Sequence, residues 1–478
     1  MQVVLPFTYA LIFIFLILKL KFFDFTGISK GQLILLFVLK IVFGFAVSAI
    51  YMFYYNTSDF DTYLKASKMG FDYFMGNSSN LIMPGWNSSF DDTMFNNSRI
   101  VIGINFLLQF ISLNIQFVHI LFFCFFSFAG LTALFRSLYK HFPNKRIALV
   151  IGIYLVPSVL FWTAGVFKET IAISCLGFLV YFTDFGLQKK YTSSQILLSI
   201  FLFILLFFTK IYIALAISPL LLANFMISKT EGKYIVLKYL SVFIAAVLMV
   251  HGFSKFGDKT NVYKMFADKQ SKAISEAKGG YFLMNDSCFI SVESSNKNAL
   301  ILQQDSTYRI KMGSSFLSWK LDNMKDTTFV VNSMDSSSFK LLYHVTPANS
   351  VVLIKPFPPT FGGILNNIPS AILNVFIQPT LFGIKNSWQL IAWLENSLVI
   401  LLLVFAVLFF DKKIAKDNEV LLFCLLLGII QFAEIGLVTP AIGAMVRYKV
   451  TALPFIVTIS LICIDSKKLF SVMKRIKN

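Results

Sequence analysis

Residues 194–228 read SQILLSIFLFILLFFTKIYIALAISPLLLANFMIS, an almost wholly apolar stretch that carries one charge, Lys210. One helix through the whole stretch would place this lysine in the middle of the hydrocarbon layer, at a cost of about 2.5–3.5 kcal/mol. Two shorter helices, 194–209 and 211–228, avoid that cost because the lysine then lies at the membrane surface. The stretch therefore predicts a pair of membrane helices joined by a tight turn at Lys210.

The composition of the whole chain agrees with this interpretation. Of its 478 residues 57% are hydrophobic and only 14% are charged, whereas soluble globular proteins have about 25% charged residues. This composition excludes an ordinary soluble enzyme, a disordered protein and a disulfide-rich scaffold. The remaining class is a polytopic membrane protein.

Apolar segments and lysine clusters together predict the topology. We expect eleven spans, at 3–18, 32–54, 114–135, 147–162, 166–184, 194–209, 211–228, 234–251, 388–410, 419–438 and 449–464. Basic residues gather in alternate loops, at 19–30, 136–146, 189–190, 229–233, 412–416 and 467–477. By the positive-inside rule these loops are cytoplasmic, which places the N-terminus outside and the C-terminus inside. The formal net charge of +18 fits this rule better than it fits nucleic-acid binding.

Two regions on the expected outer side are polar. Residues 55–99 form a loop rich in Asp, Asn and Ser, and the amphipathic stretch Ile100–Leu113 follows it. Residues 252–368 form a polar insert between the membrane parts 1–251 and 369–478. Its start, Lys255–Ala277, has a helical pattern, and short apolar runs after it predict a small β-rich domain. These runs are Cys288–Val292, Ala299–Leu302, Tyr308–Met312, Phe329–Val331, Phe339–Val345 and Val351–Ile354.

Charged and aromatic side chains collect at the expected outer ends of the spans. They are Asp59 and Asp61 after the second span, Lys168 and Glu169 at the start of the fifth, Lys210 and Tyr212 at the turn, Glu395 and Glu434 within the ninth and tenth, and Arg447, Tyr448 and Lys449 at the start of the eleventh. Arginine offers a bidentate fork to phosphate oxygens and lysine a point charge. An aspartate can act as a base toward a sugar hydroxyl. The set predicts a site for a phosphate-bearing lipid substrate.

Each of these side chains also has a purely structural interpretation. Asp59 and Asp61 are compatible with solvated loop residues, and Glu169 with the favourable N-terminal end of a helix. Lys210 and Lys449 are compatible with lysines that reach the lipid headgroups. An acid within an apolar span, such as Glu395, faces either a cavity or an ionic partner.

Five motifs carry a resemblance to a known class of proteins. They are Ser58-Asp59-Phe60-Asp61-Thr62-Tyr63, Pro157…Trp162-Thr163-Ala164-Gly165…Lys168-Glu169, Thr209-Lys210-Ile211-Tyr212, Pro379…Trp393-Leu394-Glu395-Asn396 and Gly443…Arg447-Tyr448…Pro454. With these motifs the chain resembles the GT-C class of membrane glycosyltransferases and the repeat-unit polymerases of bacterial surface-polysaccharide clusters. The resemblance samples most of the membrane portion but not the insert 252–368. The acid follows the second span rather than the first, and a lysine stands at 210 where the class usually has an arginine.

The resemblance implies an outward-facing catalytic site. It makes Asp59 or Asp61 the base or metal contact, and it makes Lys168, Lys210 and Arg447 the contacts of a polyprenyl phosphate. Glu169, Tyr212, Glu395 and Tyr448 complete the expected substrate-binding set. The resemblance implies no certain cofactor, and it leaves open whether the site binds a divalent cation.

Several functions therefore follow as expectations. The first is an inner-membrane glycosyltransferase that uses a polyprenyl-phosphate-linked sugar, with a glycan or lipid-linked acceptor, in surface-glycan assembly. The second is a polymerase of lipid-pyrophosphate-linked repeat units. A transporter or flippase and a scaffold of an envelope complex are the remaining alternatives, although we find no internal repeat of the kind that transporters commonly show.

Overall fold

The structure is a computed structural model of the chain. It describes residues 2–53, 59–76, 98–183, 192–228, 234–257, 260–285, 288–311, 313–320, 326–330, 338–348, 350–352, 354–469 and 471. Much of the expected acidic loop 55–99 lies outside these residues, as do the basic clusters at 189–190, 229–233 and 474–477. The described part is mostly helical and contains one small sheet.

Five helices of the described part are long and apolar enough to cross a membrane. They are α2 (Lys30–Phe53), α6 (Gln116–His141), α12 (Ile235–Phe253), α15 (Ser387–Leu408) and α16 (Asn418–Val438). Each coincides with a span expected from the sequence, which supports the class of membrane protein. The total of eleven spans and their orientation stay predictions.

The other expected spans are shorter or broken helices. Three are short apolar helices: α1 (Val4–Lys19), α10 (Ser193–Thr209) and α11 (Ile211–Ser228). The span at 166–184 is α9 (Lys168–Thr183). The span at 147–162 is divided into α7 (Arg146–Tyr154) and α8 (Pro157–Trp162), because Pro157 disfavours helical backbone at the residue before it. The last expected span consists of the short helix η8 (Lys449–Thr451) and the helix α18 (Leu453–Cys463). Before η8 lies α17 (Ile442–Tyr448). The helical stretch Ile442–Thr451 meets α18 at a bend of 64°.

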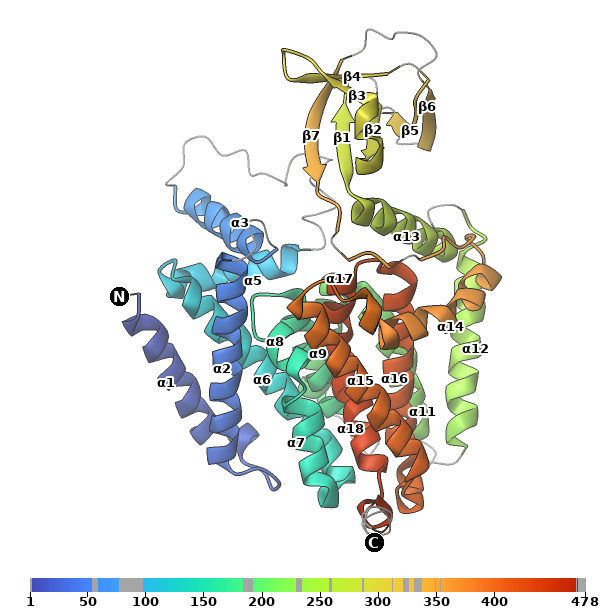
Figure 1. Cartoon of the computed structure of the whole chain (residues 1–478). Helices are drawn as coiled ribbons and strands as arrows, with labels where there is room; N and C mark the ends of the chain where they lie inside the picture. Colours follow the sequence, from blue (N-terminus) through green and yellow to red (C-terminus); the bar gives the residue numbers. More distant parts are fainter. Residues whose placement is uncertain are drawn as a thin grey trace. The chain divides into compact units, whose positions relative to one another are not determined.

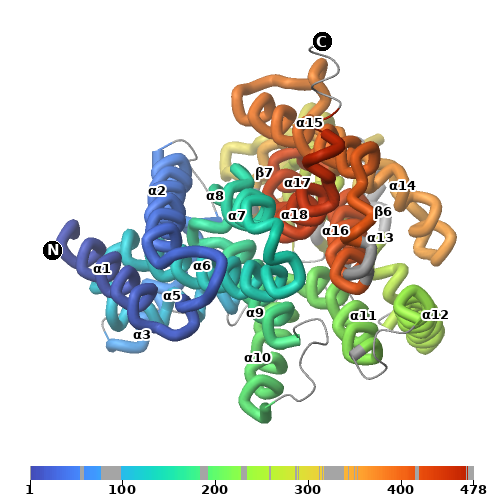
Figure 2. Tube along the Cα trace, turned by 90° about the horizontal axis from the view of Figure 1, so that it is seen from below, coloured from blue at the N-terminus to red at the C-terminus, as the bar shows by residue number. Residues whose placement is uncertain are grey.

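The chain divides into two compact units, and the first contains the helical bundle. It comprises Met1–Met249, Leu390–Glu434 and Val446–Asn478. Within this unit α6 packs against α2 on one side and against α9 on the other, and α7 packs against α18 (Figures 1 and 2). The unit also includes α3 (Asp59–Phe74) and α5 (Arg99–Ser112), the second of which matches the expected amphipathic stretch.

Small residues bring the central helices into close contact. A Cβ atom added to Gly177 of α9 would lie 1.9 Å from the carbonyl oxygen of Gly130 in α6. A Cβ atom added to Gly152 of α7 would lie 2.7 Å from the Cα atom of Thr458 in α18. Small residues at such crossings let helix backbones approach closely, which is how membrane helices gain packing energy without a hydrophobic driving force.

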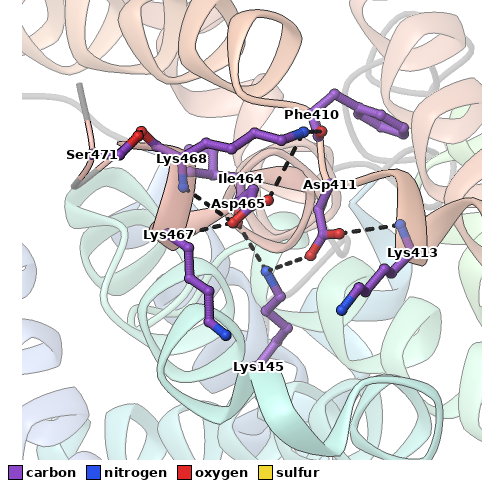
Figure 3. Close-up of polar contacts among 9 residues, drawn as sticks. All are labelled: Lys145, Phe410, Asp411, Lys413, Ile464, Asp465, Lys467, Lys468 and Ser471. Carbon is purple, nitrogen blue, oxygen red and sulfur yellow. Dashed lines mark hydrogen bonds and ion pairs between the residues drawn. The ribbon is translucent and has the colours of Figure 1, made fainter.

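A polar cluster ties together the ends of α15, α18 and α7 (Figure 3). The backbones of Phe410 and Ile464 form an isolated antiparallel bridge. Lys145 donates to the carbonyl oxygen of Ile464 at 2.9 Å and lies 3.7 Å from the carboxylate of Asp411. Lys468 in turn donates to the carbonyl oxygen of Phe410 at 2.9 Å. We call this group the Lys145 clamp.

The second unit comprises Val250–Gln389 and Ile435–Met445. Its helices include α13 (Val262–Lys278) and α14 (Phe361–Ile377). A seven-stranded sheet has the order β3-β4-β7-β1-β2-β5-β6, with every pairing antiparallel (Figure 1). The strands are β1 (Gly280–Met284), β2 (Cys288–Glu293), β3 (Leu300–Leu302), β4 (Thr307–Ile310), β5 (Ser315–Lys320), β6 (Asp326–Val330) and β7 (Phe339–Val345).

The structure confirms the small β-rich insert and changes its details. Strands β1 and β5 are absent from the expected runs. Of the expected run 351–354, Val351 forms an isolated bridge to Ala441, and its described residues belong to no strand of the sheet. The expected helix 255–277 begins at Val262, because the Asn261 side chain accepts the backbone N–H of Lys264 and caps the helix there. The expected boundary at 368 falls inside α14.

Candidate functional site

Four of the sequence-predicted residues form one chain of alternating charges in the first unit. The guanidinium of Arg447 donates from Nη1 to Asp59 Oδ2 at 2.9 Å. Its Nη2 lies 3.1 Å from Glu169 Oε2, and the other Glu169 oxygen accepts from Lys210 Nζ at 2.8 Å. Positions 59, 169, 210 and 447 thus meet in the order Asp59–Arg447–Glu169–Lys210, which we call the ion chain.

Local backbone structure explains where each member of the ion chain lies. Asp59 and Glu169 both stand in the first turn of a helix, α3 and α9 respectively, where a carboxylate is favoured by the helix dipole. Lys210 is the C-cap residue between α10 and α11, so the predicted turn at this lysine is confirmed. Arg447 lies in the last turn of α17.

Burial increases along the ion chain from Asp59 to Glu169, and Lys210 beyond it is also buried. The Asp59 side chain is 44% exposed and Arg447 12%, whereas Lys210 is 7% and Glu169 only 1% exposed. Glu169 is a deeply buried carboxylate that needs both of its cations, because an unpaired buried charge is strongly unfavourable. Asp59 is the one member of the four that meets solvent over a large part of its surface.

Aromatic rings line the cations of the ion chain. The guanidinium carbon of Arg447 lies 4.7 Å from the ring centroid of Phe167. Lys210 Nζ lies 4.0 Å from the Tyr448 centroid and 5.4 Å from that of Tyr212. Cation–π contacts of this kind hold a cation without neutralising it. The rings therefore add contacts to Arg447 and Lys210 without changing the net charge of the site.

Lys168 and Tyr63 lie at the edge of the ion chain. Lys168 is half-buried, with its Nζ 6.0 Å from the Tyr63 ring centroid, and it is within electrostatic reach of Asp59 and Arg447. Burial, with the charge of Asp59 beside it, raises the pKa of Tyr63 above its ordinary value. The phenol of Tyr63 accordingly stays protonated, and Lys168 adds a third cation to the site.

The remaining acids of the predicted set lie around the ion chain. Asp61 is half-buried and stands two residues after Asp59 in the first turn of α3. Glu434 of α16 is half-buried and within electrostatic reach of Tyr212.

Glu395 belongs to a different group of contacts. Its two oxygens accept from Ser158, one from the backbone N–H at 2.8 Å and one from the hydroxyl at 2.7 Å. Lys449 Nζ lies 3.8 Å from Glu395 and donates to Asn396. Glu395 thus binds the first turn of α8 and a lysine that follows Arg447 by two positions. These contacts are an ionic pairing of the kind that the sequence left open as an alternative for an acid in a span, and the substrate role of Glu395 stays a prediction.

One buried lysine, Lys40 of α2, is not among the candidates from the sequence. It is 1% exposed, and its ammonium donates to the carbonyl oxygen of Val159 at 3.3 Å and to the hydroxyl of Thr163. Glu395 and Lys40 therefore bind opposite ends of α8, which leads into the turn before Lys168. The sequence does contain a signal that identifies Lys40, because it is the single lysine within the apolar span 32–54. An ionisable side chain within such a span usually has a specific partner.

A metal site does not appear among the residues that the structure describes. No group of three or more His, Cys, Asp or Glu side chains in this part of the chain could hold a metal ion. Within the ion chain the two carboxylates are separated by Arg447 and both are bound to it.

Comparison with known proteins gives no family to which the chain can be assigned. No protein-family model, no curated protein and no solved structure matches it. The geometry alone therefore carries the chemical interpretation. It consists of three cations around two carboxylates, one of them half-exposed and one fully buried, on a scaffold of membrane-type helices.

Proposed function

We propose that the protein is a glycosyltransferase of the bacterial cytoplasmic membrane, which uses a polyprenyl-phosphate-linked sugar at the outer face in surface-glycan assembly. The observation that carries the proposal is the ion chain. Arg447, Lys168 and Lys210 come from separate parts of the sequence to form one positive site with a half-exposed carboxylate at its edge. Arginine with lysine at short range is the usual arrangement for binding phosphate.

The roles of the residues follow from this chemistry. The acceptor hydroxyl oxygen forms a bond to the anomeric carbon of the sugar as the bond from that carbon to the phosphate oxygen breaks. The hydroxyl proton passes to the carboxylate of Asp59 or Asp61. The released polyprenyl phosphate keeps both electrons of the broken bond, and the cations of Arg447 and Lys168 stabilise its growing negative charge.

Co-purified lipid tests this proposal. The protein is purified in a mild detergent, and native mass spectra are recorded for the wild type, for Arg447→Ala and for Arg146→Ala as a matched control. Arg146 is an exposed arginine that donates to Gln32 at 2.5 Å, away from the ion chain. We expect a polyprenyl monophosphate mass on the wild type and on Arg146→Ala, and its loss from Arg447→Ala.

Other results would favour the alternatives. A pyrophosphate-linked oligosaccharide on the wild type would indicate a polymerase of lipid-linked repeat units. Preparations that retain ordinary phospholipid but never a polyprenyl lipid would contradict the glycosyltransferase and leave a transporter or a scaffold.

A transporter is the second candidate function, and the broken helices favour it. The expected spans 147–162 and 449–464 are both interrupted, by the α7–α8 break and by the bend before α18. Transporters bind their substrates at discontinuous helices near the middle of the membrane. Uptake of labelled lipid-linked sugar into proteoliposomes, without transfer to an acceptor, would support this function instead.

A further inference from the structure

We propose that the carboxylate of Asp59 occupies the phosphate position on Arg447 when no substrate is bound, and that the phosphate of the lipid-linked donor displaces it. This inference rests on the proposed function and adds a step to it. Asp59 would close the phosphate position before binding and become a free base after it.

The three nitrogens of Arg447 differ in their surroundings. Nη2 is directed to Glu169, the most deeply buried member of the ion chain. Nη1 is directed to Asp59, which is half-exposed. Nε is buried and has no hydrogen-bond partner among the residues that the structure describes. A ligand that approaches from solvent therefore meets the Nη1 contact first.

The two carboxylates also differ in how firmly they are held. Glu169 binds Lys210 as well as Arg447, so removing it would leave the buried Lys210 without its carboxylate and Arg447 with Asp59 alone. Asp59 has Arg447 as its one ion-pair partner within the described part of the chain. Water can replace the lost partner of the half-exposed Asp59 carboxylate, so little stability depends on this contact. The contact from Asp59 to Arg447 is therefore the exchangeable one.

A phosphate can replace Asp59 without upsetting the charge balance of the site. Arg447, Lys168 and Lys210 carry three positive charges, and Asp59 with Glu169 carry two negative ones, which leaves +1. When Asp59 moves away, the remaining three cations and Glu169 leave +2. The donor phosphate is esterified to both the polyprenyl chain and the sugar, so it carries one negative charge, takes the place of the Asp59 charge and keeps the site at +1. After transfer the released polyprenyl phosphate is a monoester of about −1.5 to −2 at neutral pH, which balances the open site.

The displacement of Asp59 from Arg447 determines when its carboxylate can act as a base. While Asp59 is bound to Arg447, its Oδ2 oxygen accepts a guanidinium N–H and is directed away from an acceptor hydroxyl. Displacement by the phosphate releases this carboxylate beside the sugar that the phosphate carries. The base thus becomes available only when the donor is in place.

The test measures binding of farnesyl phosphate to the purified full-length protein in detergent by titration calorimetry, with farnesol as the uncharged control ligand. The variants are Asp59→Asn, Asp59→Ser and Asp59→Glu. Asp72→Asn is the matched control, since Asp72 lies on the same helix and pairs with Lys68 at 3.2 Å on the surface. We expect Asp59→Asn and Asp59→Ser to bind the phosphate about two- to fivefold more tightly than the wild type. Asp59→Glu and Asp72→Asn should bind like the wild type.

Each other outcome has a distinct meaning. If the wild type binds farnesyl phosphate but neither neutral variant at position 59 binds it more tightly, the exchange is refuted while the phosphate site stands. An equal gain in Asp72→Asn would also refute it, because long-range charge would then explain the effect. If the wild type shows no preference for farnesyl phosphate over farnesol, the proposed function itself fails.

Discussion

Replacing Glu169 by glutamine should destabilise the protein strongly, and a second substitution should partly restore it. Glu169 is buried between Arg447 and Lys210, so Glu169→Gln leaves two cations without their shared carboxylate. Unit charges about 4 Å apart interact by about 4 kcal/mol at an effective dielectric constant of 20. Removing one partner from a buried ion pair typically costs about 3–5 kcal/mol, and we expect a loss of stability in this range.

Lys210→Met should cost less, because Glu169 keeps its contact with Arg447. The double variant Glu169→Gln/Lys210→Met should be more stable than Glu169→Gln alone. It removes the cation that the first change leaves unpaired, while Arg447 still pairs with Asp59.

The assay is unfolding in mixed micelles with increasing dodecyl sulfate, followed by tryptophan fluorescence for the wild type, both single variants and the double variant. The coupling energy from this cycle should be about 1–3 kcal/mol. Additive losses, or a double variant less stable than Glu169→Gln, would show that the two side chains are not coupled and that the ion chain is not the stabilising arrangement described above.

Three further substitutions probe the packing and the buried charges. Gly177→Ala should lower stability by about 3 kcal/mol or more in thermal unfolding, because its Cβ atom would lie 1.9 Å from a carbonyl oxygen of the facing helix. The control is Gly103→Ala, whose Cβ atom meets open space, and it should not lower stability. Glu395→Gln should cost about 3–5 kcal/mol in the same measurement by leaving Lys449 without its carboxylate, and a loss below 1 kcal/mol would contradict the pairing. Lys40→Met should leave stability unchanged or raise it by about 1 kcal/mol, since only neutral oxygens bind this ammonium; a large loss would show that a charged partner is needed there.

The sequence predicted the turns of the bundle better than the pairing of its charges. Lys210 was expected at a turn because its charge is unfavourable in hydrocarbon, and it is the C-cap residue of α10. The same argument predicts that Asp59, Glu169 and Arg447 lie at helix ends on the outer side of the membrane. Their order in the ion chain could not be predicted, because it depends on which helices pack together, and residues at positions 59 and 447 are joined only in the folded chain.

The partners of two buried ionisable side chains, Glu395 and Lys40, could not be predicted from the sequence. Glu395 was expected among the substrate contacts, but its partner Ser158 comes from α8, a helix that exists because the backbone breaks before Pro157. Lys40 was treated as part of an apolar span. Both side chains bind α8, so the break in one helix decides the partners of charges in two others.

The Lys145 clamp places a constraint on how the chain is made. Lys145 and the carbonyl oxygen of Ile464 are 319 residues apart in the sequence. At about 5–20 residues per second, a ribosome needs roughly 15–60 s to synthesise the chain between them. During that interval the N-terminal end of α7 lacks the hydrogen bond from Lys145 to Ile464. The Lys145 clamp is therefore completed late in biosynthesis, and a chain that stalls before Ile464 lacks this contact.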